Sequence, residues 1–345
     1  MFRRRFSFLL HLACLVALAA CVASEPLQPF EGQGQVWPEP PERARISFVG
    51  EFTSASDLGI KPGFWGRIVS FAAGARNEQL VRPMAVAATA DSRTVYVADP
   101  DARCVHRFDL DRSRYNCLAP SRSESLGSPV GLALTDAGRL YVADSLLQGI
   151  YVLEPGEKWL QRLELGASLE QPTGIAWDED TGTLYVADTA AQVVKVFAAD
   201  GSFVNEFGGR GGQPGQFNFP TYLWLDGGGE LVVTDSLNFR VQRFDSGAGY
   251  ISAFGENGDR PGDFARPKGV AVDRSGHVYV VDGLFHAVQI FDRAGTLLLV
   301  IGEQGQERGK FWLPNGIFVT DDDTIFVTDA YNRRVQVFRY LEAES

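Results

Sequence analysis

Basic side chains are scarce in this chain of 345 residues, in which 43 Asp and Glu outnumber 32 Lys and Arg. Three of the Arg residues lie at positions 3–5, so the chain without its first 20 residues has 29 basic side chains and a net charge of −14. A surface this acidic repels phosphate groups. Nucleic acid is therefore excluded from the expected partners.

Long apolar runs are absent except near the N-terminus, where an apolar stretch over 6–17 follows the three Arg residues. This stretch is too short to cross a bilayer permanently and is typical of a signal peptide. Residues 18–21, with the sequence Leu-Ala-Ala-Cys, resemble the lipobox of bacterial lipoproteins. They predict a signal peptide over 1–20 and an acylated Cys21. Ordinary secretion, with cleavage after a small residue such as Ala19, is the alternative.

Several acyl chains on Cys21 would hold the protein stably on a membrane. Val22 rather than Asp follows the Cys, which favours the outer membrane by resemblance to lipoprotein sorting in Gram-negative bacteria. Residues 21–45 are rich in Pro, Gln, Gly and Glu and predict an extended tether. The predicted location is the cell envelope, with the protein facing the periplasm.

An internal repeat is the strongest feature of the sequence. Six segments begin with Pro and end 15 or 16 residues later with Asp, after a Val-rich run, and successive Asp residues are 44 to 47 apart. The segments are 83–99, 129–144, 172–188, 220–235, 267–282 and 314–329. This period suits one four-stranded antiparallel blade per repeat and predicts an all-β, six-bladed β-propeller over 46–345.

The sixth repeat lacks a fourth strand of its own, because the chain ends at Ser345 soon after a third strand near 334–339. Residues 46–52 match the fourth strand of the fifth repeat, 298–303, in residue type. We expect them to complete the last blade and to hide its edge. A separate N-terminal strand, unrelated to closure, is the alternative.

The repeats resemble NHL repeats, in which a strand ending in Asp is followed by Asn and then by an Arg-Val-Gln strand. The pattern is clearest at Asp235, Asn238 and Arg240, and again in the last repeat, while the first three repeats depart from it after the Asp. The resemblance covers 83–339 and implies the propeller fold. It does not imply one function, because NHL proteins include scaffolds, RNA binders and a few enzymes.

A structural role is expected for the Asp residues that end the second strands, although their regular spacing suggests a ring of metal ligands. A carboxylate at every junction of strand and turn, followed by Asn and Arg at fixed offsets, is what turn caps and bracing between blades require. These residues are Asp99, Asp144, Asp188, Asp235, Asp282 and Asp329.

Enzymes among the similar six-bladed propellers place metal ligands at the axial mouth, near the starts of the first strands. The corresponding residues are Met84, Val130, Thr173, Thr221, Tyr222, Lys268 and Asn315. Gluconolactonase-like hydrolases need acidic and amide ligands there, and amidating lyases that resemble NHL propellers need His. One Asn and one Lys satisfy neither, so we predict no catalytic residue, metal or cofactor. A lone Lys or Tyr could still bind an anion or polar ligand weakly.

Three His residues follow the predicted signal peptide. His106 lies along an outer strand, His277 lies in a turn on the far face, and only His286 is near the axial mouth. Each is expected to be an ordinary surface or strand His.

The loops of the two faces differ in chemistry. Loops between second and third strands share one face with the links between blades, and their apolar residues predict a protein-binding surface. These residues are Leu146, Leu147, Leu237, Phe239, Leu284, Phe285 and Tyr331. Turns of the opposite face are acidic at 178–180, 226–230 and 321–323. Alternatively, the links at 208–219 and 255–264 cover the apolar side chains, with their Phe residues inserted between blades.

Cys104 and Cys117 are expected on neighbouring strands of the first blade, opposite or nearly so, and a disulfide is predicted. Two buried thiols are the alternative. The long link at 53–82 contains Phe64, Ile68 and Phe71 at helical spacing, which predicts a short amphipathic helix. This helix could seal the channel, contact a partner or pack locally.

The sequence thus predicts a non-catalytic binding or scaffold propeller, anchored in the envelope and binding a protein through its apolar loop face. The alternative is a hydrolase or lyase with a site at the axial mouth.

Overall fold

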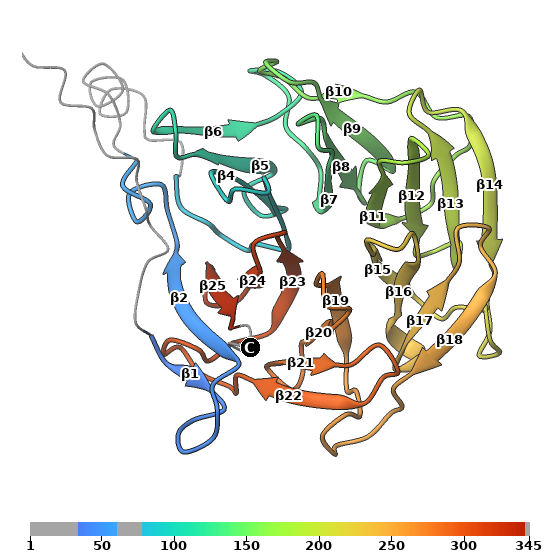
Figure 1. Cartoon of the computed structure of the whole chain (residues 1–345). Coiled ribbons are helices and arrows are strands. Elements are labelled where there is room, and N and C mark those ends of the chain that lie inside the picture. Colours follow the sequence, from blue (N-terminus) through green and yellow to red (C-terminus); the bar gives the residue numbers. More distant parts are fainter. Residues whose placement is uncertain (1–33, 61–77, 342–345) are drawn as a thin grey trace, which may run out of the picture.

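The computed structural model describes residues 34–60 and 78–341 of the chain. Six antiparallel sheets stand around a central axis and form a closed ring (Figure 1). The prediction of an all-β, six-bladed propeller is confirmed. The predicted signal peptide, the lipidated Cys21 and the predicted helix with Phe64, Ile68 and Phe71 lie outside the described residues.

Each of the first five blades consists of four strands that follow one another along the chain. The first strand of each blade lies nearest the axis, since the first strands of successive blades contact one another around the ring. Blade one contains β3 (Ala85–Ala88), β4 (Thr94–Asp99), β5 (Cys104–Asp109) and β6 (Arg114–Leu118). Blade two contains β7 (Pro129–Leu134), β8 (Leu140–Asp144), β9 (Gly149–Leu153) and β10 (Gln161–Arg162). Blade three contains β11 (Pro172–Asp178), β12 (Thr183–Asp188), β13 (Val193–Ala198) and β14 (Phe203–Gly208).

The remaining blades follow the same order. Blade four contains β15 (Pro220–Leu225), β16 (Leu231–Asp235), the 3-10 turn η1 (Ser236–Asn238), β17 (Arg240–Phe244) and β18 (Tyr250–Phe254). Blade five contains β19 (Pro267–Val272), β20 (Val278–Asp282), β21 (Ala287–Phe291) and β22 (Leu297–Ile301). Blade six contains β23 (Pro314–Val319), β24 (Thr324–Asp329) and β25 (Arg334–Tyr340), to which β1 (Val36–Trp37) and β2 (Ile46–Phe52) are added.

Burial explains why the second strands read as nearly continuous apolar runs. Every residue of β8, β16 and β20 is buried, because each blade is covered by a neighbour on both faces. Leu140 and Val142 of blade two, for example, pack against Tyr96 and Ala98 of blade one. Each fully buried side chain of this size contributes about 1.5–3 kcal/mol of transfer free energy. The outermost strand β14, by contrast, is mostly exposed.

Both ends of the chain build the closing blade. Strand β2 pairs antiparallel with β25, with Phe48 opposite Phe338 and Phe52 opposite Val335. Figure 1 shows the blue β2 beside the red strands of the C-terminal end. The prediction that 46–52 completes the last blade is confirmed.

The N-terminal part goes further than the sequence indicated, because β1 pairs with β2 as a fifth strand. The ring of Trp37 meets that of Phe338 edge-on at 5.7 Å between centroids. The predicted extended tether is therefore wrong at Val36 and Trp37, which belong to the last sheet. Trp37 packs against the apolar cluster between blades five and six, and this contact holds the Pro-rich segment on the sheet.

Three links between blades each insert a Phe between the blades that they join. Phe217, Phe264 and Phe311 are fully buried and form isolated parallel bridges within their links. A glycine stands against each ring: at Gly302, with φ +89°, a Cβ atom would lie 2.4 Å from Phe311. Phe217 and Phe264 are the inter-blade plugs of the alternative given for 208–219 and 255–264, and Phe311 is a third one in the next link.

Blade one carries a disulfide between Cys104 of β5 and Cys117 of β6, with 5.7 Å between their Cα atoms. Cys117 lies opposite His106 in the strand register, so the two Cys residues form a diagonal pair. Within 34–60 and 78–341, no helix has the length and apolar character needed to cross a membrane.

Candidate functional site

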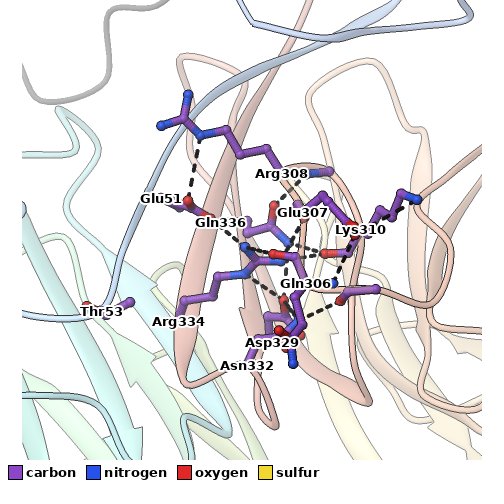
Figure 2. A network of polar contacts seen from close by, with 12 residues as sticks. Glu51, Thr53, Gln306, Glu307, Arg308, Lys310, Asp329, Asn332, Arg334 and Gln336 are labelled. Carbon is purple, nitrogen blue, oxygen red and sulfur yellow. Dashed lines mark hydrogen bonds and ion pairs between the residues drawn. The ribbon is translucent and has the colours of Figure 1, made fainter.

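The six repeated Asp residues are completely buried. Asp329 accepts hydrogen bonds from the Trp312 N–H at 2.7 Å, from Asn332 and Arg334 at 2.8 Å each, and from Gln336 at 3.2 Å (Figure 2). Asp235 is held in the same way in blade four. Each carboxylate fixes the chain that enters its own blade, as a turn cap and brace would.

The third-strand residue seven positions after each Asp varies along the ring. It is Gln in the last three blades and His106, Tyr151 and Lys195 in the first three. Lys195 forms an ion pair of 2.8 Å with Asp188, and His106 Nε2 lies 3.5 Å from Asp99. Among the described residues, no three His, Cys, Asp or Glu side chains are grouped so that they could hold a metal ion.

The three His residues belong to separate local contacts. His106 is a buried residue of the third strand β5, with Nδ1 2.9 Å from the Tyr115 hydroxyl, which is the strand position expected for it and not a surface one. The Asp273 carboxylate, 2.8 Å from His277 Nδ1, raises the pKa of that imidazole. His286 accepts a hydrogen bond of 3.0 Å from the Leu313 N–H and so connects blade five to the link before blade six.

Tyr222 crosses the axis of the ring. Its hydroxyl donates to the Met84 carbonyl at 2.7 Å and also contacts Asn315 Oδ1. Tyr222 lies in blade four, whereas Met84 directly precedes β3 of blade one and Asn315 lies in β23 of blade six, across the ring. Burial raises the pKa of Tyr222, so the phenol stays protonated. Three of the predicted axial-mouth residues therefore meet.

The other axial-mouth residues do not join this contact. Thr173 bonds to Thr189 at 2.7 Å, and Thr221 bonds to Ser236 at 2.6 Å, so each ties a first strand to the turn after its second strand. Val130 offers no polar group. Burial, together with nearby Arg266, lowers the pKa of Lys268 to about 8.

A cavity of about 540 Å³ occupies the channel on the other side of Tyr222. Its walls come from the later residues of the first strands and include Leu132, Leu134, Trp177, Trp224 and Phe318. We expected a site only at the starts of these strands and did not predict this one. The sequence nevertheless contains a pattern that could have predicted this cavity. Alternate residues of an innermost strand face the axis, and several of these residues near the strand ends are large and apolar.

The predicted protein-binding residues fall into two groups. Leu146, Leu147, Leu237, Leu284 and Tyr331 are exposed, with exposed fractions from 36% to 68%. Phe239 and Phe285 are only partly exposed, and Phe239 packs against the core between blades four and five.

Two residues of the links add to the exposed group and were not predicted. They are Phe219 and Trp312, and the Trp312 ring lies 6.0 Å from that of Tyr331. The links thus contribute apolar surface of their own and do not simply cover the apolar side chains of this face.

The acidic turns of the opposite face are partly neutralised. Glu230 forms ion pairs with Arg243 and with Arg293, the latter at 2.6 Å. Asp321 lies 3.3 Å from Arg274. This face is therefore less uniformly acidic than its turn sequences indicate.

The structure and the sequence profiles agree on the nature of the repeat. Residues 264–291 and 311–338 match the profile of the NHL repeat. The last two blades are NHL repeats. Solved structures of low sequence identity share the propeller fold. One is an auxiliary nutrient binding protein from Bacteroides thetaiotaomicron, with a TM-score of 0.61 and 14% identity over 76% of this chain and 70% of that one.

Virginiamycin B lyase from Staphylococcus aureus has a TM-score of 0.57 and 11% identity, over 86% of this chain and 100% of that one. Among characterised proteins, peptidyl-glycine alpha-amidating monooxygenase of Mus musculus is 30% identical over 131 residues, which are 34% of this chain. The match spans only 13% of the length of that protein.

Proposed function

We propose that this propeller is a non-catalytic binding module of the bacterial cell envelope and that it binds a protein through its loop face. The loop face is defined here by the exposed residues Leu146, Leu147, Leu237, Leu284 and Tyr331 together with Phe219 and Trp312. Phe239 and Phe285 are partly exposed, and Phe239 also packs against the core between blades four and five.

The observation that carries the proposal is the exposure of large apolar side chains from several blades on one face. Leu146 belongs to blade two, Leu237 to blade four, Leu284 to blade five and Tyr331 to blade six. Single exposed apolar residues are common on protein surfaces, but several large ones gathered on one face favour a contact surface. Aromatic residues such as Trp312 and Tyr331 are typical centres of protein interfaces.

A matched pair of variants tests the loop face. The first combines Leu146→Ser, Leu237→Ser, Leu284→Ser and Tyr331→Ser. The control combines Val204→Ser, Ile251→Ser, Leu298→Ser and Tyr250→Ser, which remove equally exposed apolar groups from the outer strands. After cross-linking in intact cells, the first variant should lose the partner captured by the wild type, and the control should retain it. Equal capture by both variants would reject the loop face.

The envelope anchor is the second part of the proposal, and it rests on the Arg-rich start, the short apolar run and the Leu-Ala-Ala-Cys sequence at 18–21. Cys21→Ser should release the protein from the membrane fraction or leave an uncleaved precursor. An outer-membrane address, favoured by Val22, predicts co-sedimentation with outer-membrane markers in a density gradient. A Cys21→Ser protein that is still acylated and fractionates like the wild type would contradict the anchor.

A hydrolase or lyase with its site at the axial mouth is the second candidate, and Lys268 is the observation in its favour. Its side chain is partly buried, and its pKa, lowered to about 8 by burial and by nearby Arg266, would suit nucleophilic or base chemistry. Reaction of Lys268 with a small amine-directed acylating reagent, followed by peptide mass spectrometry, measures its reactivity. Labelling at pH 8 no faster than that of Lys158 would remove this support.

A further inference from the structure

The cavity in the axial channel opens on the face opposite the loop face, so the proposed protein contact leaves it free. Its volume of about 540 Å³ is typical of sites for small organic molecules. The turns after the first strands, with Thr89, Thr135 and Thr320, form its mouth. The cavity is therefore separate from the loop face, and of the predicted axial-mouth residues only Tyr222 lines it.

The inner end of the cavity is blocked by Tyr222. Its ring spans the channel because its hydroxyl is bonded to the Met84 carbonyl across the ring of blades. Since this phenol is already engaged with Met84 and Asn315, it presents mainly its ring to the cavity. The channel is a blind pocket with an aromatic floor.

Aromatic side chains also line the wall, and their orientation is fixed by other rings. Trp177 stacks on Tyr141 with 5.2 Å between centroids, and Trp224 meets Phe318 edge-on at 5.3 Å. Leu132 and Leu134 complete the apolar wall on the side of blade two. Such preorganised walls bind an apolar body without first having to order side chains.

The rim has one sign of charge. Asp136, Glu179 and Asp321 line the cavity, and no Lys or Arg among the described residues does. Glu179 accepts a hydrogen bond from the backbone N–H of Asp136, which ties the Glu179 carboxylate to the adjoining turn that carries Asp136. Arg274 contacts Asp321 at 3.3 Å, but both side chains are largely exposed and this pair is weak.

We propose that this cavity binds an organic cation with an apolar body, such as a hydrophobic primary amine or quaternary ammonium compound. The apolar body lies between Trp177, Trp224 and Leu134, and the cationic group lies at the rim. There the carboxylates and the faces of the Trp rings both attract a positive charge. An anion of the same shape is repelled by the rim, and a neutral analogue gains only the apolar part of the contact.

Three probes with one skeleton test this proposal: 4-phenylbutylamine, 4-phenylbutanol and 4-phenylbutyrate. Binding is measured by calorimetry and by tryptophan fluorescence, to which Trp177 and Trp224 contribute. The amine should bind saturably and about tenfold more tightly than the alcohol, and the carboxylate should not bind. Absence of saturable amine binding, or equal affinity for amine and alcohol, would overturn the proposal.

Two variants and a matched control locate the binding. Asp136→Asn, Glu179→Gln and Asp321→Asn together should abolish the preference for the amine and leave the alcohol bound as before. The control combines Asp91→Asn, Asp180→Asn and Asp322→Asn, which remove three exposed carboxylates of the same face that do not line the cavity, and it should keep the preference. Trp224→Leu should weaken all binding. An unchanged amine preference in the rim variant would place the binding elsewhere and refute the site.

Discussion

Blade one and blade six are neighbours at the closure of the ring, but they hold their equivalent Asp residues, Asp99 and Asp329, in different ways. In blade six, the third-strand residues five and seven positions after the Asp are Arg334 and Gln336, and both donate to Asp329. In blade one the same two positions are Cys104 and His106. Cys104 is bonded to Cys117 of the fourth strand, and only His106 faces Asp99.

The contact between the Asp carboxylate and the backbone before the first strand is the same in both blades. Asp99 and Asp329 both accept N–H groups from the residues before their first strand, at Val81 and Trp312. The side-chain partner on the third strand is interchangeable. Blade six has the stronger ionic network, and its Arg334 also reaches Glu51 of β2 at 2.7 Å (Figure 2). In blade six, which both chain ends build, an ion pair therefore joins β25 to β2. In blade one, which is continuous in the chain, a disulfide joins β5 to β6 instead.

Removing the N-terminal strand of blade six should have the largest effect. Deletion of Ile46–Phe52 uncovers the edge of β25 and removes the buried side chains Ile46, Phe48 and Phe52. At about 1.5–3 kcal/mol for each, their loss is comparable to the whole stability of many domains. The variant should aggregate or melt far below the wild type in a thermal scan with light scattering. An unchanged melting temperature and a monodisperse protein would show that blade six does not need β2.

Arg334→Met should have the next largest effect. It leaves Asp329 buried without its cation and frees the carbonyl groups of Gln306, Glu307 and Lys310, at a cost of about 3–5 kcal/mol in denaturant unfolding.

Arg240→Met in blade four is the matched control. Arg240 binds Asp235 and the carbonyl groups of its inter-blade link as Arg334 does, but among the described residues it has no counterpart of Glu51 on a distant strand. We expect a smaller loss for this variant. Equal losses for the two variants would mean that the tie from Arg334 to Glu51 does not contribute to closure.

In blade one, removal of the disulfide should cost less. Cys104 and Cys117 are 13 residues apart, and the chain-entropy estimate for so small a loop is about 3 kcal/mol at most. Cys104→Ser with Cys117→Ser should therefore lower the free energy of unfolding by no more than this, without opening the ring. Thiol trapping with mass spectrometry should find the pair oxidised in protein taken from the envelope. Two alkylated thiols in unreduced native protein would show that blade one has no disulfide.

The smallest expected effect concerns the protonation of Asp99. Burial raises the pKa of Asp99, but His106 and the N–H groups of Val81 and Ala102 outweigh burial, so the net pKa is below the ordinary value of 3.8. A carboxylate with a lowered pKa stabilises the fold above its unfolded pKa, and this stabilisation is lost as the pH falls through the folded pKa. The difference in unfolding free energy between the wild type and Asp99→Asn should therefore shrink below about pH 4. A difference that stays constant down to pH 2 would show that Asp99 gains nothing from its partners.

Much of this architecture was predictable from local patterns. The repeated Pro and Asp residues predicted six blades, and the shortened sixth repeat predicted closure by Ile46–Phe52. Strand β1 was not predicted, because its two residues follow no alternating pattern and are held by contacts with β2 and Phe338. The strand position of His106 was predicted, but not its burial: it occupies the position of Gln in other repeats, and only the packing of blade one buries it.

The sequence alone determined the strands, their order and the number of blades, since these follow from the alternation of neighbouring residues and from a repeat of constant length. Only the tertiary structure decided what meets on the axis. Tyr222 and Met84 are 138 residues apart in the chain, and their contact across the channel depends on the tilt and curvature of blades far from both. The cavity beyond Tyr222 is likewise formed by side chains of separate strands, and no single repeat contains it.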